Sequence, residues 1–162
     1  YLLLQADGTT AGCLTYPAGN LETALLNCQQ EYQLINDKQG IWTSIASADG
    51  EKKATCRVDI NGTISVRIHP EDYLFKKPES WKPRFVLLDK DGEEIVALLP
   101  SVNWESKAYD FVLQVNEDLH AGSDPFIILH ALHCAICSMW MLNGNMIPMV
   151  DINTDTLNNC QL

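Results

Sequence analysis

Two histidines and two cysteines stand close together in the last third of the sequence, in the pattern His130-x-x-His133-Cys134-x-x-Cys137. Imidazole nitrogens and thiolates are zinc ligands, and on a helix residues three or four apart share one stripe. The outer pair of this pattern would lie about 10 Å apart along a helix axis, too far for all four side chains to bind one ion. We therefore expect hydrogen-bonded histidines and free thiols in a protein interior, without a metal.

Catalytic motifs are missing from the rest of the sequence. No G-x-S-x-G, H-E-x-x-H or P-loop pattern occurs. Asp110, Glu117 and Asp118 lie near one another, but acidic residues near the end of a strand are usually solvated. The sequence therefore favours a protein that is not an enzyme and that needs no cofactor.

Basic residues are concentrated in one part of an acidic chain. The net charge is -10, yet residues 50–84 contain eight of the eleven Lys and Arg. Such a region could bind an anionic ligand, and exposed aromatic residues in nearby loops could complete its surface. A solvated face of alternating strands would carry the same charges. The predicted ligand-binding residues are Lys76, Lys77, Trp81, Lys82, Arg84 and Trp104.

The overall charge and the cysteines limit the partners and the compartment. A net charge of -10 argues against nucleic acid and against simple electrostatic adhesion to anionic membranes. The six cysteines permit disulfides, but the chain is large for a disulfide-dependent scaffold. We expect reduced cysteines and a cytoplasmic protein, with secretion as the alternative. Asn61-Gly62-Thr63 is a glycosylation sequon that would matter if the protein is secreted.

No Lys, Arg, Asp or Glu occurs from Pro125 to Leu142, a stretch with the marks of a helix. Asp124 before it is a good N-cap, Pro125 suits the first helical position, and Asn143-Gly144 is the usual left-handed stop. Apolar residues fall on every side of the helical wheel. The predicted helix must therefore be enclosed by lipid or by the rest of the protein.

A membrane span is the less favoured of these two environments. The helix would be about 27 Å long, at the short limit for a bilayer. No basic residue follows Lys107, so the positive-inside signal is missing. We expect a buried core helix in a protein that is not an integral membrane protein, with Ile128, Leu132, Ala135 and Met139 inaccessible to solvent.

The sequence before this helix alternates between short strand-like runs and turns. The clearest hairpin joins Lys53–Ile60 to Thr63–Ile68 through Asn61-Gly62, with Ala54, Cys56, Val58 and Ile60 facing inward. The other predicted strands are Tyr1–Gln5, Thr10–Tyr16, Glu31–Asn36, Ile41–Ser47, Arg84–Leu88, Glu94–Leu99, Tyr109–Val115 and, after the helix, Met146–Ile152. Leu21–Cys28 fits either a strand or a short helix. His69–Pro83, which contains three prolines, and Pro100–Ser106 are predicted loops.

Nine to eleven short antiparallel strands and one apolar helix define the expected fold. A flat sheet cannot cover a helix on all sides, whereas a closed barrel can, and closure also removes exposed strand edges. The sequence therefore predicts a mainly β protein. Residues 1–162 would form one domain, a closed antiparallel β-barrel that surrounds a central hydrophobic C-terminal α-helix.

Three features of the sequence are similar to those of a known family. The first is the strand–turn–strand unit Tyr32–Gly40, echoed by Phe85–Ala97; the second is the Asp124-Pro125 entry into an all-apolar helix; the third is the place of that helix after the last long strand. Together they resemble the tubby C-terminal-like fold of tubby proteins, LURP-one-related proteins and phospholipid scramblases, and most of all its small fungal members. The resemblance implies a β-barrel around a central helix.

Tubby-type members of this family bind phosphoinositides through basic side chains on the barrel, although none of those positions can be matched residue by residue here. The scramblase-type acidic calcium segment is missing, because Val115–Asp124 lacks the spacing of an oxygen-ligand loop. The resemblance implies a non-catalytic tubby-like barrel that binds an anionic ligand, a lipid head group or a protein partner through its basic loop region. The alternative is a secreted or stored lectin-like protein that stacks carbohydrate on Trp104.

Overall fold

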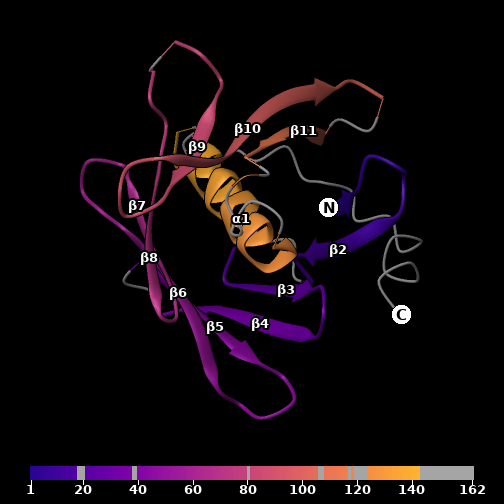
Figure 1. The fold of residues 1–162 in the computed structure, drawn as a ribbon, viewed down its shortest axis with the longest axis vertical. Helices are drawn as coiled ribbons and strands as arrows, with labels where there is room; N and C mark the ends of the chain where they lie inside the picture. Colours follow the sequence, from indigo (N-terminus) through magenta and orange to yellow (C-terminus); the bar gives the residue numbers. More distant parts are fainter. Residues whose placement is uncertain are drawn as a thin grey trace.

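The computed structural model describes residues 1–17, 21–37, 40–79, 81–105, 108–116, 118 and 124–142, and these residues form a mainly β protein (Figure 1). Eleven strands precede one helix, α1 (Pro125–Leu142). The strands are β1 (Leu2–Leu4), β2 (Thr10–Thr15), β3 (Thr23–Asn27), β4 (Glu31–Asn36), β5 (Ile41–Ala46), β6 (Lys52–Val58), β7 (Ile64–Ile68), β8 (Glu71–Lys76), β9 (Phe85–Leu88), β10 (Glu94–Asn103) and β11 (Ala108–Val115). The predicted strand Met146–Ile152 lies outside the described residues.

The strands form a single antiparallel meander in which each strand pairs with its neighbours in the sequence. The ambiguous segment Leu21–Cys28 supplies β3, because its residues pair with β2 on one side and β4 on the other. The predicted loop His69–Pro83 is wrong in part, since β8 lies within it and pairs with β7 along all six of its residues but the last. The predicted loop Pro100–Ser106 is also wrong in part, because β10 continues to Asn103.

The prediction of a closed barrel is wrong for the described strands. The sheet is open: its order runs from β1 to β11, and these two strands share no ladder. β1 has only three residues, and its pairing with β2 shifts register between Leu3 and Leu4. A bulge of this kind ends regular pairing at a sheet edge. Side chains bridge the two edges instead, because the rings of Tyr1 and Phe111 meet edge to face with centroids 5.9 Å apart.

Short turns of one repeated type connect several of the strands. In the turns at Asp7, Asp49 and Asn61 the side chain accepts a hydrogen bond from the backbone N–H two residues later, as Asn61 does from Thr63 at 3.1 Å. The following glycine has a positive φ, 81° at Gly62, which side chains rarely adopt. The prediction that Ile60 faces inward is wrong, because Ile60 belongs to this turn and is fully exposed.

Helix α1 begins where the sequence predicts. The Asp124 side chain accepts a hydrogen bond from the Phe126 N–H at 2.9 Å and so caps the helix. All twelve residues from Ile127 to Ser138 are buried. The expected burial of Ile128, Leu132 and Ala135 is confirmed, but Met139 is half-buried because the helix emerges there from its surroundings.

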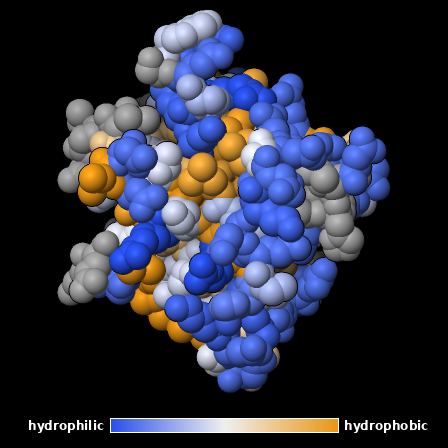
Figure 2. All heavy atoms as spheres, turned by 60° about the vertical axis from the view of Figure 1, so that its left-hand side comes forward, coloured by the Kyte–Doolittle hydropathy of each residue, from blue (hydrophilic) through white to orange (hydrophobic). Residues whose placement is uncertain are grey.

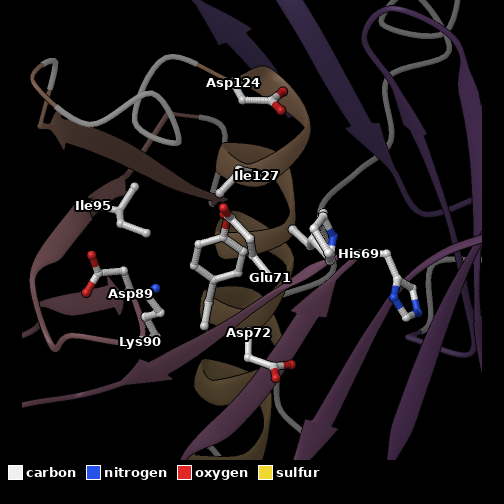
Figure 3. Close-up of a pocket in the computed structure, with 11 residues that line it drawn as sticks. His69, Glu71, Asp72, Asp89, Lys90, Ile95, Asp124 and Ile127 are labelled. Carbon is white, nitrogen blue, oxygen red and sulfur yellow. The ribbon is translucent and has the colours of Figure 1, made fainter.

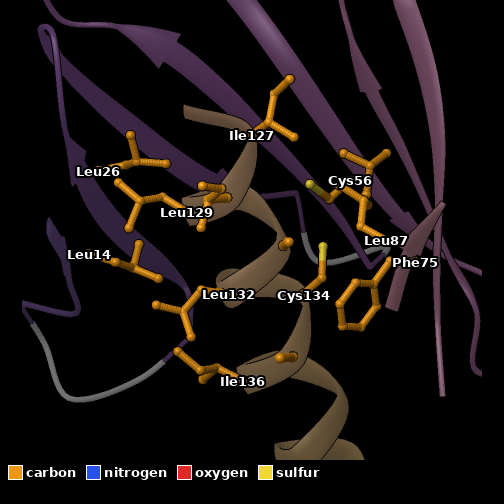
Figure 4. Close-up of a cluster of buried hydrophobic side chains, with 14 of the residues drawn as sticks. Leu14, Leu26, Cys56, Phe75, Leu87, Ile127, Leu129, Leu132, Cys134 and Ile136 are labelled. Carbon is orange, nitrogen blue, oxygen red and sulfur yellow. The ribbon is translucent and has the colours of Figure 1, made fainter. Parts of the chain in front are cut away.

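The strands in Figure 1 follow one another around α1, and the gap between the two sheet edges lies between β11 and the β1–β2 hairpin. Figure 4 shows what the helix packs against: Leu14 and Leu26 on one side, and Cys56, Phe75 and Leu87 on another. Burial of this apolar surface is the main favourable contribution to folding. In the part of the chain that is described, no helix is long and apolar enough to span a membrane.

Candidate functional site

The two helix histidines are enclosed and uncharged. The Nδ1–H of His130 donates to the carbonyl oxygen of Phe126 at 2.7 Å, and its Nε2 has no partner among the described residues. His133 Nδ1 lies 2.9 Å from the Tyr16 hydroxyl, and its Nε2 lies 3.5 Å from Cys137 Sγ. Burial lowers the pKa of His130 to about 4 and that of His133 to about 3. Both imidazoles are therefore neutral near neutral pH.

The helix thiols are poor nucleophiles because they are buried. Desolvation raises the pKa of Cys134 and Cys137 well above that of a free thiol, and Cys134 also contacts Cys56 in β6. Protonated thiols bind metals weakly. Across the described residues, no group of three or more His, Cys, Asp and Glu side chains is arranged to hold a metal ion. Cys28 is also free, whereas Cys13 is disulfide-bonded, so the expectation of reduced cysteines is wrong at Cys13.

The predicted basic residues lie along the connection between β8 and β9. Lys76 is the last residue of β8, and both it and Lys77 are half-buried. The ammonium of Lys82 lies 4.5 Å from the ring centroid of Trp81 and 3.1 Å from a carboxylate oxygen of Glu79. Arg84 pairs with Glu94 at 2.5 Å. The structure thus brings Trp81 and Lys82 together and leaves Trp81 74% exposed.

Trp104 lies in a different connection, between β10 and β11, and is 83% exposed. In an antiparallel meander the end of β8, the start of β9, the end of β10 and the start of β11 all lie at one end of the sheet. The β8–β9 and β10–β11 connections therefore share this end. Among the described residues no ring contact joins Trp104 to Trp81, so the two indoles are separate exposed surfaces.

The opposite end of the same strands contains a cavity that the sequence does not predict. Its volume is about 610 Å³, and three segments far apart in the sequence enclose it (Figure 3). They are the β7–β8 turn with the start of β8, the β9–β10 turn with Ile95, and the first turn of α1. The lining residues are Ile68, His69, Pro70, Glu71, Asp72, Tyr73, Asp89, Lys90, Ile95, Asp124 and Ile127. Figure 2 shows a hollow with a hydrophobic floor and a hydrophilic rim on the face formed by β7 and β8.

Most carboxylates of the cavity have a local structural partner. Asp72 accepts two hydrogen bonds from Arg67, at 2.6 and 3.1 Å. Asp89 accepts the backbone N–H groups of Asp91 and Glu93 at 2.9 and 2.8 Å and so holds the β9–β10 turn. Asp124 caps α1 through the Phe126 N–H. These roles need an oxygen acceptor, but they leave negative charge beside the cavity.

Tyr73 lines the cavity together with three of these carboxylates, Glu71, Asp89 and Asp124. It donates a hydrogen bond to Glu71. Burial, this hydrogen bond and the charges of Glu71, Asp124 and Asp89 all raise the pKa of Tyr73. The same three carboxylates therefore act on one phenol of the cavity lining.

The sequence contains no signal for this cavity, because its acidic residues come from three segments far apart in the chain, with at most two in any one of them. Comparison with known proteins adds no further residues to either surface, because no protein-family model, no curated protein and no solved structure matches the chain.

Proposed function

We propose that the chain is a non-catalytic binding protein that takes an anionic ligand, such as a lipid head group, at the β8–β9 connection. The observation that carries this proposal is the pairing of Trp81 with Lys82. An indole that is 74% exposed, with an ammonium 4.5 Å from its ring centroid, offers an apolar surface and a positive charge side by side. Trp and Lys together suit the polar–apolar boundary of a lipid surface.

The cations around Trp81 fit a binding surface of modest affinity. Lys82 and Arg84 each have one carboxylate partner, which orients them and partly neutralises them. Exposed ion pairs are worth about 0–1 kcal/mol, so an incoming phosphate can replace Glu79 at little cost. The molecule as a whole is acidic, so we expect recognition of a head group rather than general attraction to negative membranes.

The architecture proposed with this function is the tubby-like one, with α1 as the internal core of the sheet. The burial of residues Ile127–Ser138 supports it, as do ring contacts of the helix with strands β4 and β5: Phe126 with Tyr32, and His133 with Trp42. An open sheet replaces the closed barrel in this version of the architecture.

Carbohydrate binding by a secreted or stored protein is the second candidate, and the exposure of Trp104 favours it. At 83% exposure the indole face is free to stack on a sugar ring. Asn103 beside it donates to Asp110 at 3.0 Å, and hydrogen-bonding groups of this kind accompany sugar stacking. This surface is independent of Lys82, which makes the two candidates separable.

Sedimentation with vesicles and a glycan array, run side by side, test the two candidates. We expect the parent protein to bind vesicles of phosphatidylcholine mixed with a phosphoinositide, and not vesicles of phosphatidylcholine alone. Trp81→Ala and Lys82→Gln should each abolish most of this binding, whereas Trp104→Ala should leave it unchanged. Glycan binding that Trp104→Ala removes would establish the second candidate instead. Binding in neither assay would leave a protein partner and would overturn both.

A further inference from the structure

The cavity at the other end of the strands has an apolar floor. Ile95 of β10 and Ile127 of α1 are buried core residues that reach its wall, and the ring of Tyr73 lies beside them. Figure 3 shows Ile127 between Asp124 above it and the strand residues below it, with Asp89 and Lys90 on one side and His69 on the other. A volume of about 610 Å³ is within the range of small-molecule sites and far exceeds what a bare metal ion needs.

The charged groups at the mouth of the cavity are unbalanced. Arg67 neutralises Asp72 through its two hydrogen bonds. Glu71, Asp89 and Asp124 remain, and the lining offers them one ammonium, that of Lys90. Within the described residues, Lys90 itself forms no ion pair with a carboxylate. Like charges beside an apolar wall repel one another, and a cationic ligand would relieve that repulsion.

We propose that this cavity binds a small organic cation, with its ammonium group among Glu71, Asp89 and Asp124 and its apolar body on Ile95, Ile127 and Tyr73. An anionic ligand is disfavoured by the same three carboxylates. A metal ion is disfavoured because Asp89 and Asp124 already use an oxygen in the turn and in the helix cap. The site does not include Trp81 or Lys82, so this proposal can be tested separately from the proposed function.

Dansylcadaverine is a suitable probe, because it joins a primary ammonium to an apolar fluorophore whose emission rises in apolar surroundings. Its matched control is N-butyl dansylamide, which has the same fluorophore and no charge. We expect the cationic probe to bind the parent protein at least tenfold more tightly than the neutral one. Raising the NaCl concentration should weaken binding of the cationic probe severalfold, because salt screens the carboxylates.

Variants that remove one charge and keep the local structure test whether the probe binds in this cavity. Asparagine retains the oxygen that the turn and the cap need, so Asp89→Asn and Asp124→Asn should fold. Each should weaken dansylcadaverine binding about fivefold, and Glu71→Gln should do the same. Asp49→Asn is the control, because Asp49 holds the β5–β6 turn through the Glu51 N–H at 2.8 Å and does not line the cavity.

Three results would overturn this proposal. The first is equal binding of the charged and neutral probes, which would show that the carboxylates select nothing. The second is equal weakening by Asp49→Asn and Asp89→Asn, which would indicate diffuse attraction to an acidic surface. The third is the absence of any fluorescence change. Trp81→Ala should leave probe binding unchanged, and a loss in that variant would place the probe at the other end of the sheet. If Asp124→Asn lowers the melting temperature, Asp89→Asn and Glu71→Gln still decide the outcome.

Discussion

Leu129 of α1 packs directly onto the backbone of Gly12 in β2. A β-carbon built on Gly12 would lie 2.9 Å from Leu129 Cδ1 and 2.7 Å from the carbonyl oxygen of Asn27. Both distances are shorter than real β-carbon contacts. The φ of Gly12 is outside the left-handed region, so the position requires glycine for space and not for conformation. Helix and strand are therefore in contact with no room for a side chain between them.

Replacing Gly12 with alanine tests this contact. We expect Gly12→Ala to destabilise the protein by about 1–3 kcal/mol, because either α1 or the β2–β3 pairing must shift to admit the methyl group. Urea unfolding measures the change. Thr10→Ala, at an exposed position of the same strand, should change stability by less than about 0.5 kcal/mol. A Gly12→Ala protein as stable as the parent would mean that α1 does not press on β2.

The same substitution at two positions of α1 distinguishes the effect of burial from the effect of helix propensity. Leu132 is 5% exposed and Met141 is 39% exposed. Leu132→Asp would bury an unpaired charge at a cost of several kcal/mol, comparable to a total stability of roughly 5–15 kcal/mol. We expect little folded protein from this variant, whereas Met141→Asp should fold and unfold much as the parent does. Equal melting temperatures for both variants would contradict the burial of α1.

Acid should destabilise the protein through the two helix histidines. Their pKa values in the folded state are lowered to about 4 at His130 and about 3 at His133, whereas an unfolded histidine has a pKa near ~6.5. Between these values the unfolded chain binds more protons than the folded one. Stability is therefore present above about pH 6.5 and is lost as the pH falls towards the folded-state values, by up to ~1.4 kcal/mol per pH unit for each histidine.

Urea unfolding between pH 7 and pH 5 measures this loss. His130→Leu should remove about half of the dependence of the unfolding free energy on pH. It also removes the unpartnered Nε2 atom. The window stays above the range in which carboxylates titrate, so they contribute little to it. An equal free energy of unfolding at pH 7 and pH 5 would show that the imidazoles are accessible to protons in the folded protein.

A thiol count tests the redox state and with it the compartment. The structure has free thiols at Cys28, Cys56, Cys134 and Cys137 and a disulfide at Cys13. Titration with a thiol reagent in denaturant should give about four thiols per chain before reduction and all six cysteines after it. Six thiols before reduction would support the cytoplasmic expectation and remove the disulfide. Disulfides persist in oxidising compartments, so a count of four would favour secretion.

Much of the fold could be predicted because its signals are local. The strand Glu31–Asn36 and the helix Pro125–Leu142 have the predicted bounds, since alternation marks the first and the uncharged run with its cap marks the second. The strand β8 could not be predicted because Pro70 and Pro78, just outside its ends, are typical of a loop. Closure could not be predicted, because it depends on whether β1 and β11 meet, and no local pattern reports that distance.

The two surfaces differ in how far the sequence could find them. Trp81 and Lys82 are adjacent in the chain, so the sequence alone predicts that they lie close together. The cavity depends on Glu71, Asp89 and Asp124, which are brought together by the meander and by the entry of α1. Asp89 has an ordinary explanation as a turn residue, Asp124 as a helix cap and Glu71 as an exposed residue at the start of a strand, so the sequence alone gives no reason to group them.

The strand order has a consequence for how the chain reaches its structure. Because spatial order equals sequence order, every ladder joins neighbours in the chain, and the sheet can grow hairpin by hairpin with short loops to close. Buried residues of several of these strands pack in one cluster with α1, which follows all eleven strands in the sequence. During synthesis, β1 to β11 emerge from the ribosome before the helix that packs on them. Until then residues such as Leu14, Leu26 and Phe75 remain exposed, and a nascent chain at this stage is the form of the protein most open to chaperones and to aggregation.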